Sequence, residues 1–299
     1  MTQESAPWVE RSLVVTADDF GLAREVNEAV EIAHRDGILT AASLMVAEPS
    51  AADAVARAKR LPGLAIGLHL TLVEGRPILP ASAIPDLVGP DGRLRTDLAR
   101  YGAAIFFRKV VQLQVAAEIG AQFEAFARTG LALDHVDAHK HFHLHPTIAR
   151  LLLAIGPRYG MRALRIPAEP GEVLRRVEPT RIGLEARLAG AYTAALRRKA
   201  KRAGLAVADH VFGLSWSGAM TTGRVAGLLR HLPPGRTEIY THPAFAGGFD
   251  GHTAGYRYAD ELAALVSPDA KDARAMLRPV PGSYSGWAGR PPSLPNTQT

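Results

Sequence analysis

Three consecutive pieces of the sequence indicate the class of fold: SLVVTA at Ser12–Ala17, EVNEAVEIAHRD at Glu25–Asp36 and ILTAASLMV at Ile38–Val46. The first and third pieces are short apolar runs typical of buried strands, whereas the middle piece carries apolar residues at helical spacing. A strand, a helix and another strand in this order predict a crossover between two parallel strands.

The same alternation continues along the chain. Further strand candidates lie at Leu64–Leu70, Ala132–Asp137, Arg162–Ile166, Val211–Leu214 and Glu238–Thr241, and further helical segments at Ala51–Arg60, Val110–Arg128, Thr147–Tyr159, Leu184–Arg202, Arg224–His231 and Tyr256–Val266. About seven strand and helix units predict an α/β fold, most naturally a distorted (β/α)7-type barrel, with a doubly wound open sheet as the alternative.

The 299 residues fit one large barrel or two average domains. No shift in composition marks a boundary, so we expect one domain over residues 1–281. An insertion at about 77–95 is rich in Pro and Gly and long enough to be a functional loop. Residues 282–299 are expected to form a disordered tail.

Composition excludes several classes of protein. Hydrophobic residues make up 47% and charged residues 21%, as in globular proteins. There is no cysteine, so any metal site must use His and carboxylate ligands. The net charge is +6, but the basic residues are scattered apart from a run at 197–202 that is typical of a helix face, so we expect no nucleic acid partner.

The ends of the chain and its hydropathy indicate the compartment. The first twelve residues carry acids and no apolar run, and no uncharged apolar stretch of about eighteen residues occurs anywhere. We therefore expect neither a signal peptide nor a membrane span, and a cytoplasmic protein.

Two adjacent carboxylates, Asp18 and Asp19, follow the first strand and precede Gly21. Active sites of barrels lie at the carboxyl ends of the strands, so this pair is a candidate for metal binding and acid–base chemistry. Neighbouring residues on a strand point in opposite directions, so both acids can face one site only if the chain already turns there. The alternative is an acidic pair that complements the dipole of the following helix.

Histidines follow two other strands at the same position. His69 ends the third strand candidate, and His242 precedes Pro243 at the end of the last one. Alone, His69 would be interpreted as a core residue and His242 as a turn residue. Because carboxyl ends of parallel strands meet at one edge of a sheet, we expect both to converge with Asp18 and Asp19.

The strongest signal is the segment Asp134–Pro146, DHVDAHKHFHLHP, in which five of the eleven histidines fall. Asp137 and the histidines at 139, 141, 143 and 145 alternate with other residues, so in an extended chain they would share one face. We expect one of these histidines to be a metal ligand and the others to contact substrate or support the site. The alternative is a chance His-rich tract on a solvated edge.

These motifs carry a resemblance. TADDFG, GLHL, HVDAHKHFHLHP and THP, in this order, are similar to the YdjC/ChbG-like carbohydrate deacetylase family, closest to its hopanoid biosynthesis-associated HpnK branch. The resemblance implies a barrel related to polysaccharide deacetylases and a metal-dependent hydrolase that removes the N-acetyl group from an N-acetylglucosaminyl substrate, expected to be a hopanoid lipid.

The resemblance also implies roles for single residues. Asp19, His69 and His139 match the family's metal ligands, Asp18 matches the general base, and His242 matches a general acid. His141, His143 and Asp137 are candidates for substrate contacts. Some relatives carry three consecutive histidines where this chain has Lys140 between two, which changes the substrate side of the motif. The ligand set suits one divalent ion, Zn²⁺ or Mg²⁺, with Mn²⁺, Co²⁺ or Ni²⁺ as alternatives.

Other functions remain as alternatives. The chain could act on soluble chitooligosaccharides, which would require the insertion to form a sugar-binding cleft rather than an apolar lip. A non-catalytic sugar- or lipid-binding barrel is disfavoured by Asp18, since a binding module needs no base beside a ligand. A lipid substrate would bring the protein to an anionic inner membrane surface, with Phe106 and Phe107 beside Arg108 and Lys109 as a contact, unless these rings lie in the core.

Overall fold

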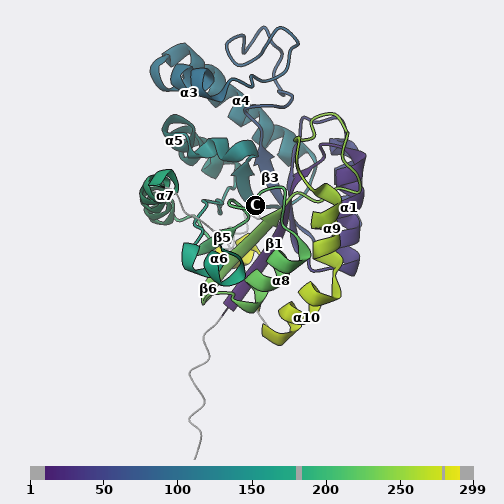
Figure 1. The fold of residues 1–299 in the computed structure, drawn as a ribbon. Coiled ribbons are helices and arrows are strands. Elements are labelled where there is room, and N and C mark those ends of the chain that lie inside the picture. Colours follow the sequence, from purple (N-terminus) through teal and green to yellow (C-terminus); the bar gives the residue numbers. More distant parts are fainter. Residues whose placement is uncertain (1–10, 180–183, 278–279, 290–299) are drawn as a thin grey trace, which may run out of the picture.

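The computed structural model describes residues 11–179, 184–277 and 280–289, in which one parallel sheet is covered by helices (Figure 1). Its strands are β1 (Arg11–Phe20), β2 (Ala41–Leu44), β3 (Ala65–Leu70), β4 (Leu133–Ala138), β5 (His210–Phe212) and β6 (Gly235–Thr241). They lie in the order β4-β3-β2-β1-β6-β5, and the short β7 (Val280–Pro281) pairs with the start of β1. All the pairs are parallel, as the crossover pattern predicts.

Helices connect the strands and cover the outside of the sheet (Figure 1). They are α1 (Arg24–Asp36), α2 (Ala51–Lys59), α3 (Leu98–Phe107), α4 (Lys109–Arg128), α5 (Pro146–Ile155), α6 (Gly171–Val177), α7 (Leu184–Arg202), α8 (Thr222–Arg230), α9 (Tyr258–Val266), α10 (Pro268–Leu277) and α11 (Tyr284–Trp287), together with the 3-10 helices η1 (His139–Leu144) and η2 (Gly156–Tyr159). The described helices do not include one that is long and apolar enough to cross a membrane.

Strand β1 is the centre of the sheet. Residues 13–20 are all buried, which explains why this strand reads as a nearly continuous apolar run rather than an alternating one. It extends past the predicted end at Ala17 and includes Asp18 and Asp19. Helix α1 begins only at Arg24, so the acidic pair lies in the strand and not in the first turn of the helix.

The segment 162–168 continues the curl of the sheet without forming a regular strand. Leu164 forms an isolated bridge with Val136 of β4, and the neighbouring residue bridges to Ala206 on the other side. The backbone N–H of Arg165 donates to the carbonyl of Val136 at 2.9 Å. The predicted strand there is thus reduced to single bridges, and Arg165 is held at the open side of the sheet with its side chain fully buried.

Part of the predicted disordered tail is ordered. Residues 282–289 include the short helix α11, in which Tyr284 is fully buried and donates its hydroxyl to Glu238 at 2.5 Å. The polar composition of this segment predicted disorder, but the buried ring of Tyr284 anchors it to the rest of the protein. The expected tail at 290–299 lies outside the described residues.

The insertion at about 77–95 is ordered against α4. Glu118 accepts backbone N–H groups of Ile78 and Leu79, and Gln114 accepts the backbone N–H of Asp86. Ile84 and Leu87 of the insertion itself are fully buried. Buried carboxylate and amide acceptors therefore replace the regular hydrogen bonds that this Pro-rich segment cannot make.

Candidate metal and catalytic site

The carboxyl ends of four strands bring the predicted site residues together. Asp18 and Asp19 lie at the end of β1, His69 on β3, His139 just after β4, and His242 just after β6. A cavity of about 260 Å³ is lined by all five side chains, and we call it the catalytic cavity. The five side chains thus converge at one edge of the sheet, as their positions at strand ends predict.

Asp19 reaches the two histidines because the chain turns within β1. The pairing of β1 with β2 shifts register between Ala17 and Phe20, and Asp19 has a φ of 64°. This left-handed conformation is uncommon for a residue other than glycine, and Asp tolerates it better than most. The turn re-aims a residue that a regular strand would point away from Asp18, so both carboxylates face the same cavity.

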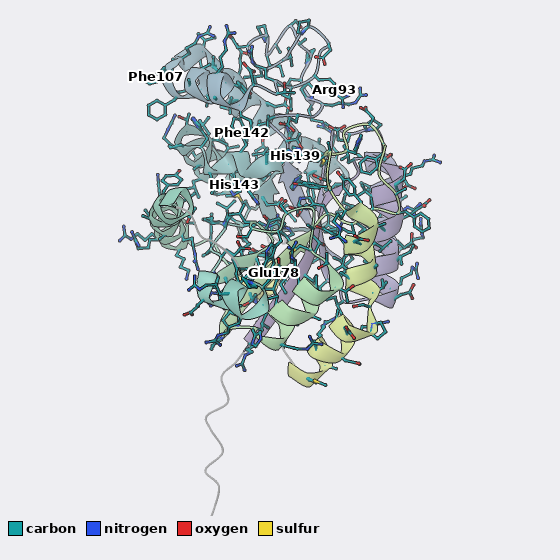
Figure 2. All side chains as sticks on the ribbon, in the orientation of Figure 1. Arg93, Phe107, His139, Phe142, His143 and Glu178 are labelled. Atoms are coloured by element: carbon teal, nitrogen blue, oxygen red, sulfur yellow. The ribbon has the colours of Figure 1, made fainter. Side chains whose placement is uncertain are left out.

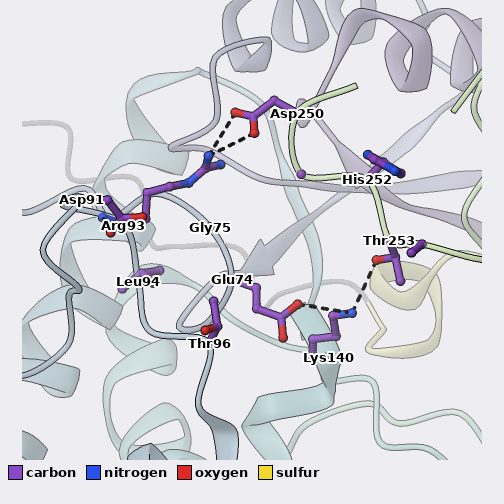
Figure 3. Close-up of a pocket in the computed structure, with 12 residues that line it drawn as sticks. Glu74, Gly75, Asp91, Arg93, Leu94, Thr96, Lys140, Asp250, His252 and Thr253 are labelled. Atoms are coloured by element: carbon purple, nitrogen blue, oxygen red, sulfur yellow. Dashed lines mark hydrogen bonds and ion pairs between the residues drawn. The ribbon is translucent and has the colours of Figure 1, made fainter. Parts of the chain in front are cut away.

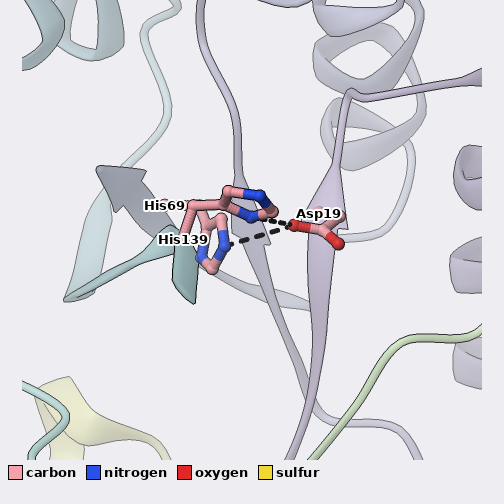
Figure 4. Close-up of side chains that lie close together, drawn as sticks. All are labelled: Asp19, His69 and His139. Atoms are coloured by element: carbon pink, nitrogen blue, oxygen red, sulfur yellow. Dashed lines mark hydrogen bonds and ion pairs between the residues drawn. The ribbon is translucent and has the colours of Figure 1, made fainter. Parts of the chain in front are cut away.

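The side chains of Asp19, His69 and His139 form a compact cluster (Figure 4). Oδ1 of Asp19 lies 3.2 Å from Nε2 of His69 and 3.0 Å from Nδ1 of His139. The three potential ligand atoms lie within 4.8 Å of one another. Burial raises the pKa of Asp19, but the charges and hydrogen bonds of the two histidines outweigh burial and hold the pKa well below its ordinary value.

This donor set fits a divalent cation. Asp137 Oδ1 lies 3.0 Å from Nδ1 of His69, so Nδ1 carries the proton in neutral His69 and the Nε2 lone pair faces Asp19. A carboxylate and two imidazoles suit Zn²⁺ and also tolerate harder ions, and three protein ligands leave coordination positions open for catalysis. The described residues thus contain a buried Asp/His cluster compatible with a metal ion.

A second set of potential ligand atoms, from Asp18, His69 and Asp137, is less suitable. Arg165 donates to both oxygens of Asp18 at 2.6 and 2.8 Å and forms an ion pair with Asp137. The guanidinium already neutralises these carboxylates, and a divalent cation beside it would be repelled. The site therefore favours the set with Asp19 and His139.

Arg165 is the main functional candidate that the sequence analysis missed. Its fully buried guanidinium contacts Asp18, Asp137 and Glu238, and lies 4.8 Å from the ring centroid of Tyr240. Burial lowers the pKa of Arg165, but the three carboxylates outweigh it and raise the pKa well above its usual range. The available signal was a lone charged residue inside the apolar segment Ala163–Ile166.

His242 faces Asp18 across the catalytic cavity. Its Nε2 lies 4.0 Å from Oδ2 of Asp18, and its side chain is 11% exposed. Its backbone N–H donates to buried Glu261, which fixes the start of the loop after β6. Its Nδ1 is buried and has no hydrogen-bond partner among the described residues.

The prediction that the alternating residues of the His-rich segment share one face is wrong beyond Ala138. The chain enters η1 after β4, and Lys140 and His141 adopt positive φ values of 53° and 51°. Alternation by two residues holds only for extended backbone, so the side chains separate. Of the alternating set, His139 and His141 line the catalytic cavity.

The three residues predicted to contact substrate, His141, Asp137 and His143, differ in whether they reach the catalytic cavity. His141 lines the catalytic cavity, and its Nε2 lies 2.9 Å from the hydroxyl of Tyr240. Asp137 is fully buried behind His69, where it orients that ring. His143 is buried, its Nε2 lies 2.8 Å from the carbonyl of Arg165, and burial lowers its pKa to about 4. The positions of Asp137 and His143 are thus those of supporting residues.

Comparisons with known proteins agree with this site. A family model described as YdjC-like protein matches residues 12–275. A carbohydrate deacetylase from Vibrio vulnificus strain YJ016 is 38% identical over 147 residues, which are 49% of this chain and 56% of that protein. The matched part of the chain thus spans about half the length of this relative.

Two further comparisons cover more of the chain. A carbohydrate deacetylase from Mus musculus is 32% identical over 285 residues, with 86% of this chain and 88% of that protein covered. A solved structure from Enterococcus faecalis V583, of a candidate cellobiose-phosphate cleavage protein, has a TM-score of 0.73 and 26% identity and covers 93% of this chain and 98% of that one. The predicted α/β fold with a barrel-like parallel sheet is therefore confirmed.

Proposed function

Because the chain belongs to the YdjC-like protein family, we propose that it is a carbohydrate deacetylase that removes the N-acetyl group from an N-acetylglucosaminyl substrate with one divalent metal ion. The deacetylase names of its relatives support this activity. The observation that carries the proposal is the joint position of a candidate metal cluster, a carboxylate and a histidine around one cavity.

Three groups of residues have separate roles in the proposed amide hydrolysis. Asp19, His69 and His139 would hold the ion, Zn²⁺ or Mg²⁺ by preference, which supplies Lewis acidity toward the acetyl carbonyl and lowers the pKa of a water. Asp18 accepts a proton from the attacking water, since its oxygens keep lone pairs beyond those used by Arg165. His242 delivers a proton to the amine as the C–N bond breaks, which yields acetate and a free amino sugar.

His242→Ala is expected to reduce kcat by about a hundredfold to ten-thousandfold, the usual contribution of a general acid. The amine of a sugar is more basic than an activated aryl amine and therefore depends more on receiving this proton as it leaves. The loss should therefore be smaller for aryl acetamides than for the sugar substrate. Equal losses in kcat for both substrate types would show that His242 is not the acid.

We propose a glycosylated hopanoid lipid as the acceptor, and an exposed apolar surface supports this choice. Phe106, Phe107, Val110 and Leu113 on α3 and α4 form this surface, and the side chain of Phe107 projects outward (Figure 2). The rings of Phe106 and Phe107 are 51% and 80% exposed, so the alternative of a core position is wrong. Leu98, at the start of the same α3, lines the catalytic cavity.

This apolar surface predicts peripheral contact with an anionic membrane. Lys109 adjoins it, and each basic side chain near an anionic surface adds on the order of 1 kcal/mol of attraction. In a flotation assay at low salt, the protein should move with anionic liposomes more than with neutral ones. Phe107→Ser should reduce this recovery, whereas Met276→Ser, which removes an equally exposed side chain on α10, should leave it unchanged. Equal recovery of wild type and Phe107→Ser would contradict the contact.

A second candidate substrate is a soluble chitooligosaccharide. A neighbouring hollow (Figure 3), which shares Lys140 and Thr253 with the catalytic cavity, is lined by Asp91 and Arg93 of the insertion, and such polar side chains suit a sugar. Incubation of the metal-loaded protein with an N-acetylglucosaminyl hopanoid and with diacetylchitobiose, followed by measurement of free acetate, decides between the two. Release of acetate from neither substrate would refute the proposed function.

A further inference from the structure

The short helix α11 lies at the amino ends of the strands, opposite to the catalytic cavity. Nε1 of Trp287 donates to the hydroxyl of Ser12 near the start of β1 at 2.8 Å. The backbone N–H groups of Tyr284 and Ser285 donate to the carboxylate of Asp134, near the start of β4, at 3.2 and 2.8 Å. The amino ends of β1 and β4 are thus held by a segment that follows residues 12–275, the part of the chain that the family model matches.

A chain of buried side chains runs from Tyr284 to Asp18. The hydroxyl of Tyr284 donates to Oε2 of Glu238, and both oxygens of Glu238 also accept from the guanidinium of Arg165. Arg165 in turn donates to both oxygens of Asp18. Burial and the charge of Glu238 raise the pKa of Tyr284 well above its usual value, so the hydroxyl remains a donor. The hydroxyl of Tyr284 therefore helps to fix where Arg165 holds Asp18.

A second buried chain runs from Asp134 to His69. Nδ1 of His135 lies 3.0 Å from Oδ2 of Asp134, and Nε2 of the same ring lies 3.0 Å from Oγ of Ser43. The hydroxyl of Ser43 donates to Oδ2 of Asp137 at 2.9 Å, and the other oxygen of Asp137 lies 3.0 Å from Nδ1 of His69. The chain thus ends on the ring that offers Nε2 to the candidate metal cluster.

The hydroxyl of Ser43 defines the direction of the hydrogen bonds in this second chain. Because its hydrogen points to Asp137, its oxygen accepts from Nε2 of His135, and a cationic ring also donates from Nδ1 to Asp134. Burial lowers the pKa of His135, but the hydrogen bond and the charge of Asp134 outweigh burial and raise it. As an imidazolium, His135 has a partner at each nitrogen.

The ring of His135 occupies a space that β3 and α11 leave for it. A Cβ atom at Gly67 would lie 2.4 Å from Nε2 of His135, so a side chain at this position would displace the ring. The ring of Tyr284 stacks on that of His135, with the centroids 5.0 Å apart and an angle of 30° between the planes. Tyr284 therefore contacts both chains, and fully partnered buried networks of this kind make side chains rigid.

We propose that Ser43, His135 and Tyr284 are positioning residues of the active site. Ser43 and His135 fix the candidate metal ligand His69, and Tyr284 fixes the base Asp18. The inference rests on the proposed function, which assigns these roles to His69 and Asp18. Stability alone does not explain the two chains, because apolar side chains in a sheet interior are often at least as stabilising as buried charges.

Ser43→Ala should weaken the binding of Zn²⁺ about tenfold, the lower end of the loss that follows removal of an outer partner of a metal ligand. The lower end is expected because Arg165 still contacts Asp137. Competition with a chelator of known affinity measures the change. Ser267→Ala is the matched control, since this half-buried serine donates to the carbonyl of Ala264 between α9 and α10. Its affinity should stay within about twofold of wild type. Unchanged Zn²⁺ affinity in Ser43→Ala, even with a lower unfolding temperature, would show that this chain only supports the fold.

Tyr284→Phe should lower kcat about tenfold, as expected for the loss of a hydrogen bond to a charged group, while KM and Zn²⁺ affinity keep their wild-type values. The ring stays in place and only the donor to Glu238 is removed, so the base is displaced without a change in substrate binding. Tyr159→Phe is the matched control, because its hydroxyl donates to a glutamate at the surface, Glu124, and its kcat should be that of wild type. An unchanged kcat in folded Tyr284→Phe would overturn the role of Tyr284.

The measurement of Zn²⁺ affinity needs no turnover, so it separates this inference from the proposed function. Weaker Zn²⁺ binding in Ser43→Ala together with a wild type that releases no acetate would refute the deacetylase function and support the positioning of His69. Acetate release by wild type, with unchanged Zn²⁺ affinity in Ser43→Ala and unchanged kcat in Tyr284→Phe, would refute the inference and leave the function.

Discussion

Asp18→Asn is expected to lose turnover by about ten-thousandfold, the upper end of what a general base contributes, while the metal stays bound. The amide has nearly the shape of the carboxylate but cannot take up a proton from water. The three candidate metal ligands do not include Asp18, so the cluster of Asp19, His69 and His139 keeps all its donor atoms. Turnover is measured by acetate release, and metal content by elemental analysis of the same preparation.

The fold should survive this substitution. Arg165 loses one of its three carboxylate partners but keeps Asp137 and Glu238. An amide N–H that faces guanidinium donors leaves a buried mismatch, which should cost about 1–3 kcal/mol of unfolding free energy. A thermal unfolding curve checks that the variant is folded at the assay temperature. Loss of the metal in Asp18→Asn would favour the alternative ligand set with Asp137.

Replacement of Asp19, His69 or His139 by Ala is expected to reduce both metal content and activity to background. Each residue contributes one donor atom to a set of three, and the two remaining protein donors bind a divalent ion weakly. The variants should stay folded without the ion, because the strands that carry these residues are held by the sheet itself. Metal content after dialysis against a low concentration of chelator is the measurement.

His231→Ala serves as the control for these three variants. His231 is an exposed histidine after the end of α8 and lies outside the candidate metal cluster. Its substitution should leave both metal content and activity at the wild-type level. Full metal occupancy in all three cluster variants would show that the ion, if present, binds elsewhere.

The local pattern of the sequence was sufficient to specify the class of fold. Short apolar runs that alternate with segments of helical spacing specify parallel strands and crossover helices, because both periods follow from the backbone geometry alone. The position of Asp18, His69 and His242 at strand ends was also sufficient to place them together, since parallel strands bring their carboxyl ends to one edge. These inferences needed only local pattern and a topological rule.

The local conformation of the site came from tertiary structure. The positive φ of Asp19 and the start of η1 after Ala138 change where side chains point, and neither is visible in hydrophobic periodicity. A strand continued through His143 would have placed His141 and His143 on the face of His139. The turn into η1 instead buries His143 against Arg165 and places Lys140 beside Glu74 and Thr253.

The surroundings of Arg165 could not be inferred from the local sequence. Its three carboxylate partners are 147, 28 and 73 residues away along the chain, at Asp18, Asp137 and Glu238. A buried guanidinium is stable only where several acids surround it, and those acids come from three different strands of the sheet. Sequence shows a charged residue in an apolar segment, but the curl of the sheet brings its partners to it. The sequence therefore determined which strands supply the site, and the curvature of the sheet decided which charges meet inside it.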